Sequence, residues 1–220
     1  TALGGTGMCI AADVIRKYGW GCDCLTEDME FSMKCLTHGI RTCWAHDAIV
    51  YDEKPLTFMA SWRQRKRWAQ GQFDCAERYI PRLFKAAIQK KSFMILDGIM
   101  QLLQNYFLLF STAVGIMTYI NIFHPCFTMI LYNDVLVPRQ FWTVIGTIQY
   151  ILPLIVLLQI EVPLKIWFYW LLYPLFMYSW IPVTFLGYLD RHKKGWVHTI
   201  HTRSMHFEQA SLTRKKEIDR

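Results

Sequence analysis

Apolar and polar positions divide the chain into three parts. Residues 1–91 mix charged and apolar residues in short periodic stretches, which is typical of an α/β domain. Residues 93–189 form long aromatic and aliphatic runs with almost no charge, which is the composition of membrane-spanning helices. Residues 190–220 are polar and basic again. The pattern therefore predicts an α/β part, a membrane part and a basic tail.

Capping residues predict three helices in the first part. A short helix is expected over Asp13–Tyr18, and a second over Thr26–His38, with Thr26 as its N-cap and Gly39 after its last residue. A third helix is expected to start at Thr57 and to reach about Tyr79. The buried stripe of the second helix is predicted to comprise Phe31, Cys35 and Leu36.

The remaining stretches of the first part predict strands and a glycine-rich turn. Short strands are expected at Met8–Ile10, Arg41–Ala45 and Ala48–Tyr51. Glycines at Gly4–Gly7 permit close approach of the backbone to a ligand, so the turn is either a phosphate cradle or a tight turn that lines a cleft. No Gly-Lys-Ser or Gly-Lys-Thr follows, so the turn is not a P-loop.

An acidic cluster, Thr26-Glu27-Asp28, opens the second predicted helix. The helix dipole favours negative charge in the first turn, so acids at this position often serve stability alone. The spacing leaves that interpretation and a chemical role both open.

A second cluster, Gln64-Arg65-Lys66-Arg67-Trp68, lies in the third predicted helix shortly before the membrane part. Positions i, i+3, i+4 and i+7 share one side of a helix, and here they are Gln64, Arg67, Trp68 and Gly71. These side chains do not make a hydrophobic core stripe. Arg offers paired donors for a phosphate, and Trp offers a flat surface for a sugar ring. Arg63 and Lys66 fall elsewhere on the helix and are expected to face lipid headgroups.

The membrane part contains three hydrophobic elements. The first, Phe93–Phe123, begins with polar positions that line a protein interior, a conduit or a helix contact, namely Asp97, Gln101, Gln104 and Asn105. The second, Phe141–Ile160, is a span that tolerates Pro153 as a kink. The third, Lys165–Leu189, is broken by prolines at positions 174 and 182 and is rich in Trp and Tyr, which suits an interfacial position.

The net charge of +7 is concentrated on both flanks of the membrane part. Basic residues at 63–67 precede it and basic residues at 191–194 follow it, and such clusters mark the cytoplasmic side of spans. An even number of crossings must then separate them. We therefore expect two full spans, with the third element interfacial, re-entrant or spanning. Because the basic clusters adjoin hydrophobic blocks, nucleic acid is not an expected partner.

Cysteine and histidine give no sign of a metal site. The seven cysteines form no Cys-x-x-Cys pair, so neither a disulfide framework nor a zinc site is predicted, and scattered thiols fit a reducing compartment. The tail histidines at 198, 201 and 206 lack a carboxylate or thiol to complete a ligand set. The opening residues, Thr1–Gly7, read as the middle of a domain, so we expect the chain to be a fragment of a longer protein.

The two clusters and the block behind them resemble the processive family 2 glycosyltransferases, which include cellulose, chitin, hyaluronan and poly-N-acetylglucosamine synthases. The resemblance is carried by Thr26-Glu27-Asp28, then Gln64-x-x-Arg67-Trp68, then membrane helices, and it covers nearly the whole chain. The tail is similar to the gating loop that those enzymes place over the diphosphate, through Trp196, Thr199, Thr202 and Arg203.

The resemblance implies an architecture and an activity. Residues 1–58 would be the C-terminal half of a GT-A-type α/β catalytic domain, 59–92 interfacial helices, 93–189 a membrane region and 190–220 a cytoplasmic, gating-loop-like tail. The implied protein is a UDP-sugar-dependent hexosyltransferase in a plasma (inner) membrane. Its multi-pass chain would extend a polysaccharide with inversion on the cytoplasmic side and extrude it through the bilayer.

The resemblance also implies roles for single residues. Asp28 matches the general base, and a carboxylate at a helix start stays ionised. Arg67 matches the ligand of the diphosphate and Trp68 the surface for the acceptor sugar. Glu27 and Gln64 belong to the same acceptor- and diphosphate-binding motifs.

One departure from the family concerns the donor side. The family binds uridine and Mg²⁺ or Mn²⁺ through aspartates in the first half of the GT-A domain. Asp47 and Asp52 do not reconstruct that motif, so the metal ligands are expected outside this chain. The 220 residues alone are therefore expected to have no transferase activity.

Two other functions stay open. One is a non-catalytic membrane transporter or anchor, in which the charged clusters serve packing and lipid contact. The other is a lipid-linked single-sugar transferase, against which Gln64–Trp68 argues because such an enzyme holds no polymer end. The partners expected from the resemblance are a UDP-sugar, a polysaccharide acceptor and the lipid bilayer.

Overall fold

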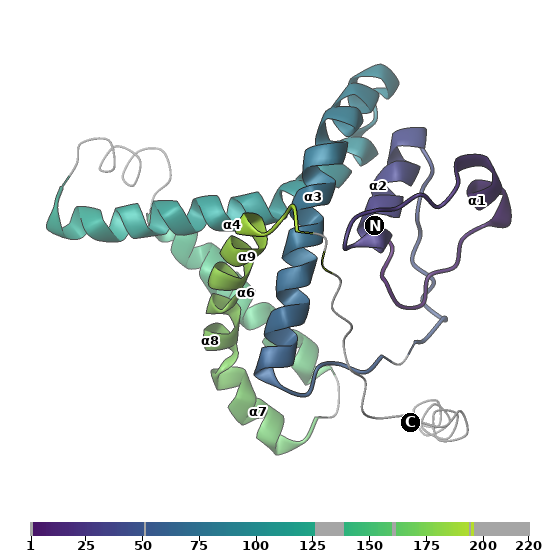
Figure 1. The fold of residues 1–220 in the computed structure, drawn as a ribbon. Helices are drawn as coiled ribbons and strands as arrows, with labels where there is room; N and C mark the ends of the chain where they lie inside the picture. The colour runs from purple at the N-terminus through teal and green to yellow at the C-terminus, as the bar shows by residue number, and fades with distance from the viewer. Residues whose placement is uncertain (1, 51, 126–138, 160–161, 194, 196–220) are drawn as a thin grey trace. The chain divides into compact units, whose positions relative to one another are not determined.

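The computed structural model describes residues 2–50, 52–125, 139–159, 162–193 and 195, and the side chains of Arg139 and Trp142 are outside this description. Regular structure in these residues is helical, and the helices are α1 Ala12–Tyr18, α2 Glu27–His38, α3 Phe58–Lys90, α4 Phe93–Phe123, α6 Arg139–Leu158, α7 Leu164–Leu171, α8 Tyr173–Tyr178 and α9 Trp180–Leu189 (Figure 1). The chain divides into two compact units. One comprises Thr1–Asn105 with Leu186–Arg220, and the other comprises Tyr106–Phe185.

The first two helices end at the glycines predicted from the sequence. Helix α1 ends before Gly19, whose amide donates to Ile15 O. Helix α2 ends before Gly39, which has a left-handed backbone with φ 82°. The amide of Gly39 donates to Leu36 O and that of Ile40 donates to Cys35 O, both at 2.9 Å, which is the Schellman arrangement. The predicted buried stripe of α2 is also confirmed, because Phe31, Cys35 and Leu36 are buried.

Helix α3 begins where predicted and ends later than predicted. The hydroxyl of Thr57 accepts a hydrogen bond from the amide of Ala60 at 3.2 Å. The helix then passes through Pro81 and continues to Lys90 instead of ending near Tyr79. Proline costs about 3 kcal/mol in a helix interior. Burial of Leu83, Ala86 and Ala87 beyond the proline offsets that cost.

The strands predicted in the first part do not form in the described residues. Residues 8–10, 41–45 and 48–50 make no ladder there. A β-strand needs hydrogen bonds to a neighbouring strand, and none of these three stretches has such a neighbour within the described chain. Its large apolar side chains stay exposed, as the exposed fraction of 79% at Trp44 shows. The α/β fold class remains a prediction.

The core of the first unit lies among α2, α3 and the first turns of α4. Its fully buried side chains include Phe31, Met33, Phe73, Leu83, Ile95 and Leu102. Close approach of α4 to α2 depends on Gly98, since a Cβ placed there would lie 2.6 Å from Leu36 Cδ1. The amide of Gln72 donates to Gln101 O at 2.9 Å and joins α3 to α4. Of the predicted polar positions on α4, Asn105 is buried and Asp97 is exposed.

The second unit contains the remaining apolar helices. In the described residues α4 is long and apolar enough to cross a membrane, and α7 joined to Tyr173–Leu189, bent by 51°, would be a second such segment. The apolar stretch Thr143–Leu158 of α6 is shorter, so the second full span stays a prediction. Pro153 lies inside α6, and the third element is interrupted before each of its prolines, as predicted.

Candidate active site

The acidic and basic clusters meet where the start of α2 packs against α3 (Figure 1). Gly71 makes this possible, because a Cβ placed on it would lie 2.6 Å from Thr26 Oγ1 and 2.7 Å from Thr26 N. The sequence placed Gly71 on the same side of α3 as Arg67 and Trp68, and the continuous helix confirms this. The two clusters therefore lie next to each other in the structure.

Thr26 has a different role from the one predicted. It precedes α2 as expected, yet its hydroxyl makes no capping hydrogen bond. Its φ of −124° and ψ of 76° turn the side chain towards α3, where Thr26 Oγ1 is buried without a hydrogen-bond partner among the described residues. Contact with Gly71 has replaced capping.

Asp28 is a half-buried carboxylate at the start of α2. Its Oδ1 accepts a hydrogen bond from the amide of Met29 at 2.7 Å. Burial raises the pKa of Asp28 above its ordinary value, the neighbouring Glu27 raises it further, and amide hydrogen bonds, including one from Gly5, oppose the shift. The helix start alone favours ionisation, as we expected, but burial outweighs it. A carboxylate with a raised pKa is a stronger base.

The glycine-rich turn lies against this carboxylate. A Cβ placed on Gly5 would lie 3.4 Å from Asp28 Oδ2. The amide of Leu3 donates to Ser32 Oγ at 2.8 Å and holds the turn on α2. These contacts favour the interpretation as a tight turn at the edge of the site.

Arg67 projects from α3 towards the loop before α2. Its Nη1 donates to the carbonyl oxygen of Leu25 at 3.1 Å. In the part of the chain that the structure describes, this is the hydrogen bond made by the guanidinium, so most of its N–H donors remain available to a ligand. Gln64 is half-buried, and Trp68 is 39% exposed, which leaves ring surface for contact.

The opposite side of α3 corrects a prediction. Lys66 was expected to face lipid headgroups, but its ammonium forms an ion pair with Asp190, just after α9. The side-chain amide of Gln70 donates to Asp190 O at 3.0 Å. Hydrogen bonds from Lys193 and Lys66 hold the pKa of Asp190 at about 2.

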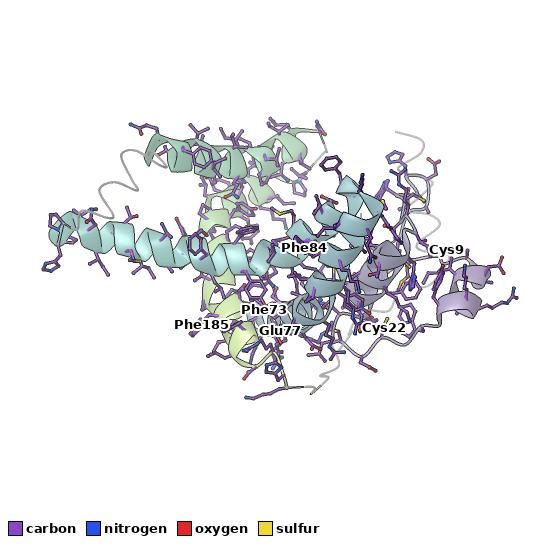
Figure 2. All side chains as sticks on the ribbon, turned by 90° about the horizontal axis from the view of Figure 1, so that it is seen from above. Cys9, Cys22, Phe73, Glu77, Phe84 and Phe185 are labelled. Atoms are coloured by element: carbon purple, nitrogen blue, oxygen red, sulfur yellow. The ribbon has the colours of Figure 1, made fainter. Side chains whose placement is uncertain are left out.

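Further contacts fix the end of α9 on this side. Arg191 Nε lies 2.6 Å from Glu77 Oε1, so this cation is also paired within the protein. Phe73 and Glu77 project from the same side of α3 (Figure 2), and the Phe73 ring meets the Tyr188 ring edge-on at 5.2 Å. A Cβ on Gly187 would lie 2.6 Å from Ala69 Cβ.

Glu30 is a buried acid beside these residues that no sequence motif marked. It is 3% exposed, and its Oε2 accepts hydrogen bonds from the amides of Asp23 and Cys24, both at 2.7 Å. The sequence held only one signal, an acid directly beside the buried Phe31.

The described residues do not assemble a metal site. Among them no group of three or more His, Cys, Asp or Glu side chains could hold an ion. Asp47 is exposed, and Asp52 pairs with Lys54 at 2.8 Å. Asp47 and Asp52 therefore belong to no such group among the described residues. The gating-loop-like residues Trp196, Thr199, Thr202 and Arg203 lie outside the described residues, as do the tail histidines.

Comparison with known proteins places this chain in a family. The profile of the family described as "Glycosyl transferase family group 2" matches residues 1–183. The chain is 32% identical to the probable glycosyltransferase YdaM of Bacillus subtilis (strain 168) over 82 residues, which are 37% of this chain and 20% of that protein. It is 26% identical to the probable glucomannan 4-beta-mannosyltransferase 3 of Arabidopsis thaliana over 188 residues, 82% of this chain and 32% of that protein.

The chain thus spans between a fifth and a third of the length of these relatives. No solved structure matched it. Because the family profile covers most of the chain, the chain belongs to glycosyl transferase family group 2.

Proposed function

We propose that the intact protein is a membrane-embedded, inverting glycosyltransferase that transfers a sugar from a UDP-sugar to a growing polysaccharide. One observation carries this proposal. The contact of Thr26 with Gly71 and the hydrogen bond from Arg67 to Leu25 O join the start of α2, where Asp28 lies with a raised pKa, to the side of α3 that carries Arg67. A base and a phosphate-binding cation in one place are what transfer from a nucleotide sugar needs.

Asp28 is the general base in this proposal. It takes the proton from an acceptor hydroxyl as that oxygen attacks the anomeric carbon of the donor sugar. The bond between that carbon and the diphosphate oxygen breaks in the same displacement, so the anomeric configuration inverts. The raised pKa of Asp28 suits it to accept this proton, and the amides of Met29 and Gly5 stabilise its charged form beforehand.

The basic cluster serves the leaving group and the acceptor. Arg67 donates paired N–H groups to the diphosphate and stabilises the charge that develops there. Trp68 stacks on the terminal acceptor sugar, and its exposed ring supports this role. Glu27 and Gln64 complete the hydrogen bonding to acceptor and diphosphate. Mg²⁺ or Mn²⁺ ligands would come from residues other than those described.

The apolar helices support a membrane location. We place the enzyme in a plasma membrane, with residues 1–92 on the cytoplasmic side and the helices of 93–189 in or on the bilayer, where they would carry the product outwards. The length and composition of α4 support this placement.

The test is nucleotide release by the intact protein in detergent or vesicles, with Mg²⁺ or Mn²⁺. The donors are UDP-glucose, UDP-N-acetylglucosamine and UDP-glucuronate. GDP-mannose is added because one relative is named as a mannosyltransferase. Release with one donor, lost in Asp28→Asn and retained in the exposed control Asp13→Asn, is the expected result.

The products separate this proposal from its alternatives. Long chains support a polysaccharide synthase, whereas a single sugar on a lipid identifies a lipid-linked transferase. Silence with every donor from a folded protein would favour a non-catalytic membrane role. Release that persists in Asp28→Asn would remove the role given to Asp28.

A further inference from the structure

Glu30 is a buried charge that the proposed chemistry does not use. Burial of a carboxylate is costly unless the charge is paired and hydrogen-bonded. Two backbone amides, those of Asp23 and Cys24, donate to its Oε2, and Arg78 Nη1 lies 3.8 Å from its Oε1. Arg78 is itself held by two hydrogen bonds to Asp74, at 2.9 and 2.8 Å. The buried carboxylate is therefore anchored to α3 and holds the loop before α2.

That loop leads directly to the contact made by Arg67. The carbonyl of Leu25, one residue after Cys24, accepts the hydrogen bond from Arg67 Nη1. A carbonyl lies in the plane of its peptide group, and that plane can turn only through the φ and ψ angles of the residues on either side. Hydrogen bonds from the amides of residues 23 and 24 to Glu30 fix the backbone before Leu25. The contact of Thr26 with Gly71 fixes the backbone after it.

We propose that Glu30 is a positioning residue that sets the direction of the Leu25 carbonyl and, through it, the Arg67 guanidinium. This inference rests on the proposed role of Arg67 as a ligand of the donor diphosphate. Glu30 itself is too deeply buried to touch substrate. Its contribution is to hold Arg67 in one orientation before the nucleotide arrives, which lowers the entropy cost of binding.

A double-mutant cycle in the intact enzyme tests the coupling. Glu30→Ala is expected to raise the KM for the sugar nucleotide and the Kd for UDP by about tenfold, with a smaller change in kcat. In an Arg67→Ala background, the same substitution is expected to change either constant by less than about twofold. Glu30→Gln keeps the shape and an amide acceptor, and is expected to lie between wild type and Glu30→Ala. Equal effects of Glu30→Ala in both backgrounds would overturn the inference.

Hydrogen exchange provides a readout that does not depend on turnover. The amides at positions 23–25 are expected to exchange faster in Glu30→Gln and Glu30→Ala than in wild type, and no faster in the control Asp13→Asn. Unchanged exchange in both Glu30 variants would show that the carboxylate does not hold the loop. If wild type neither binds UDP nor releases nucleotide, the proposed function fails, and with it the idea that Glu30 positions a ligand of the diphosphate. Faster exchange in the Glu30 variants would still establish that Glu30 holds the loop.

Discussion

Helix α3 carries polar residues on two sides, and the two sides differ in how these residues are satisfied. On the side that faces the end of α9, Lys66 and Glu77 form ion pairs with the chain just after that helix. On the side that faces α2, Arg67 donates to one loop carbonyl and Trp68 is exposed. The sequence separated Arg67 and Trp68 from Lys66 by helix periodicity, but it did not show that Lys66 has a partner within the protein. Spare hydrogen-bonding capacity, and not charge, therefore separates the α2 side of this helix from the α9 side.

The largest expected effect comes from Asp28→Asn on the α2 side. Loss of a general base is expected to lower transfer by about 10²–10⁴-fold, measured as nucleotide release by the intact enzyme. The amide keeps an oxygen to accept the hydrogen bond from Met29, so the local fold is expected to persist. Transfer near the wild-type rate would place the base elsewhere.

Asp28→Asn is also expected to raise the free energy of unfolding near neutral pH. The folded-state pKa of Asp28 is above its ordinary value, so ionisation costs folding free energy as the pH rises from the unfolded pKa of about 4 through the folded one. Asparagine removes that cost. Thermal unfolding as a function of pH is expected to show the variant gaining on wild type as the pH rises, with no gain in acid. A gain that is independent of pH would contradict this account.

The next effect in size is that of Arg67→Ala, which is expected to lower kcat/KM for the sugar nucleotide by about 10²-fold. Arg67→Lys is expected to recover little, because an ammonium cannot give paired donors to a phosphate. The matched control is Arg63→Ala, an exposed cation on the same helix, for which nucleotide kinetics are expected to stay close to wild type. Equal losses in the two alanine variants would point to the general charge of the helix and not to a ligand.

Gly71 and Gly187 allow close packing on the two sides of α3, so their alanine variants can be compared directly. Gly71→Ala is expected to cost about 1–3 kcal/mol of stability because its Cβ would meet Thr26 at 2.6 Å, and to lower activity by separating the two clusters. Gly187→Ala meets Ala69 at the same distance and is expected to lower stability with little change in nucleotide KM. Thermal unfolding and kinetics of both variants, with Gly115→Ala as a control in open space, measure the difference.

The site was predictable where local spacing determines it. Positions i, i+3, i+4 and i+7 put Arg67, Trp68 and Gly71 on one side of α3 whatever the rest of the chain does. Glu30 was missed because its partners are amides of a loop, and a sequence pattern does not say where loop amides point. The role of Lys66 was misjudged because its partner lies 124 residues away.

The fold shows the same division. Caps at Gly39 and Thr57 gave two helix boundaries directly, since capping depends on neighbouring residues alone. The extent of α3 beyond Pro81 could not be predicted, because burial of its last turns outweighs the local penalty. A strand needs a paired neighbour, and residues 41–45 and 48–50 have none among the described residues, which a local pattern cannot reveal.

The smallest expected effect on activity tests the α9 side. Lys66→Glu and Asp190→Lys are each expected to lower the Tm of the intact protein, and the double variant to recover part of it, because the ion pair is restored with reversed sign. Recovery is partial because Lys193 Nζ lies 2.7 Å from Asp190 Oδ1 and would face a lysine.

The folded-state pKa of Asp190, about 2, is below its ordinary value. The ion pair therefore contributes to stability above about pH 4, and this contribution is lost as the pH falls towards 2. The difference in Tm between wild type and Asp190→Asn is therefore expected to shrink over that range. Nucleotide KM is expected to stay within about twofold of wild type in the double variant, since neither residue meets the ligand. If Lys66→Glu raised KM as strongly as Arg67→Ala, the two sides of α3 would not be separate in function, and saturation of hydrogen bonds would no longer distinguish structural from binding residues on this helix.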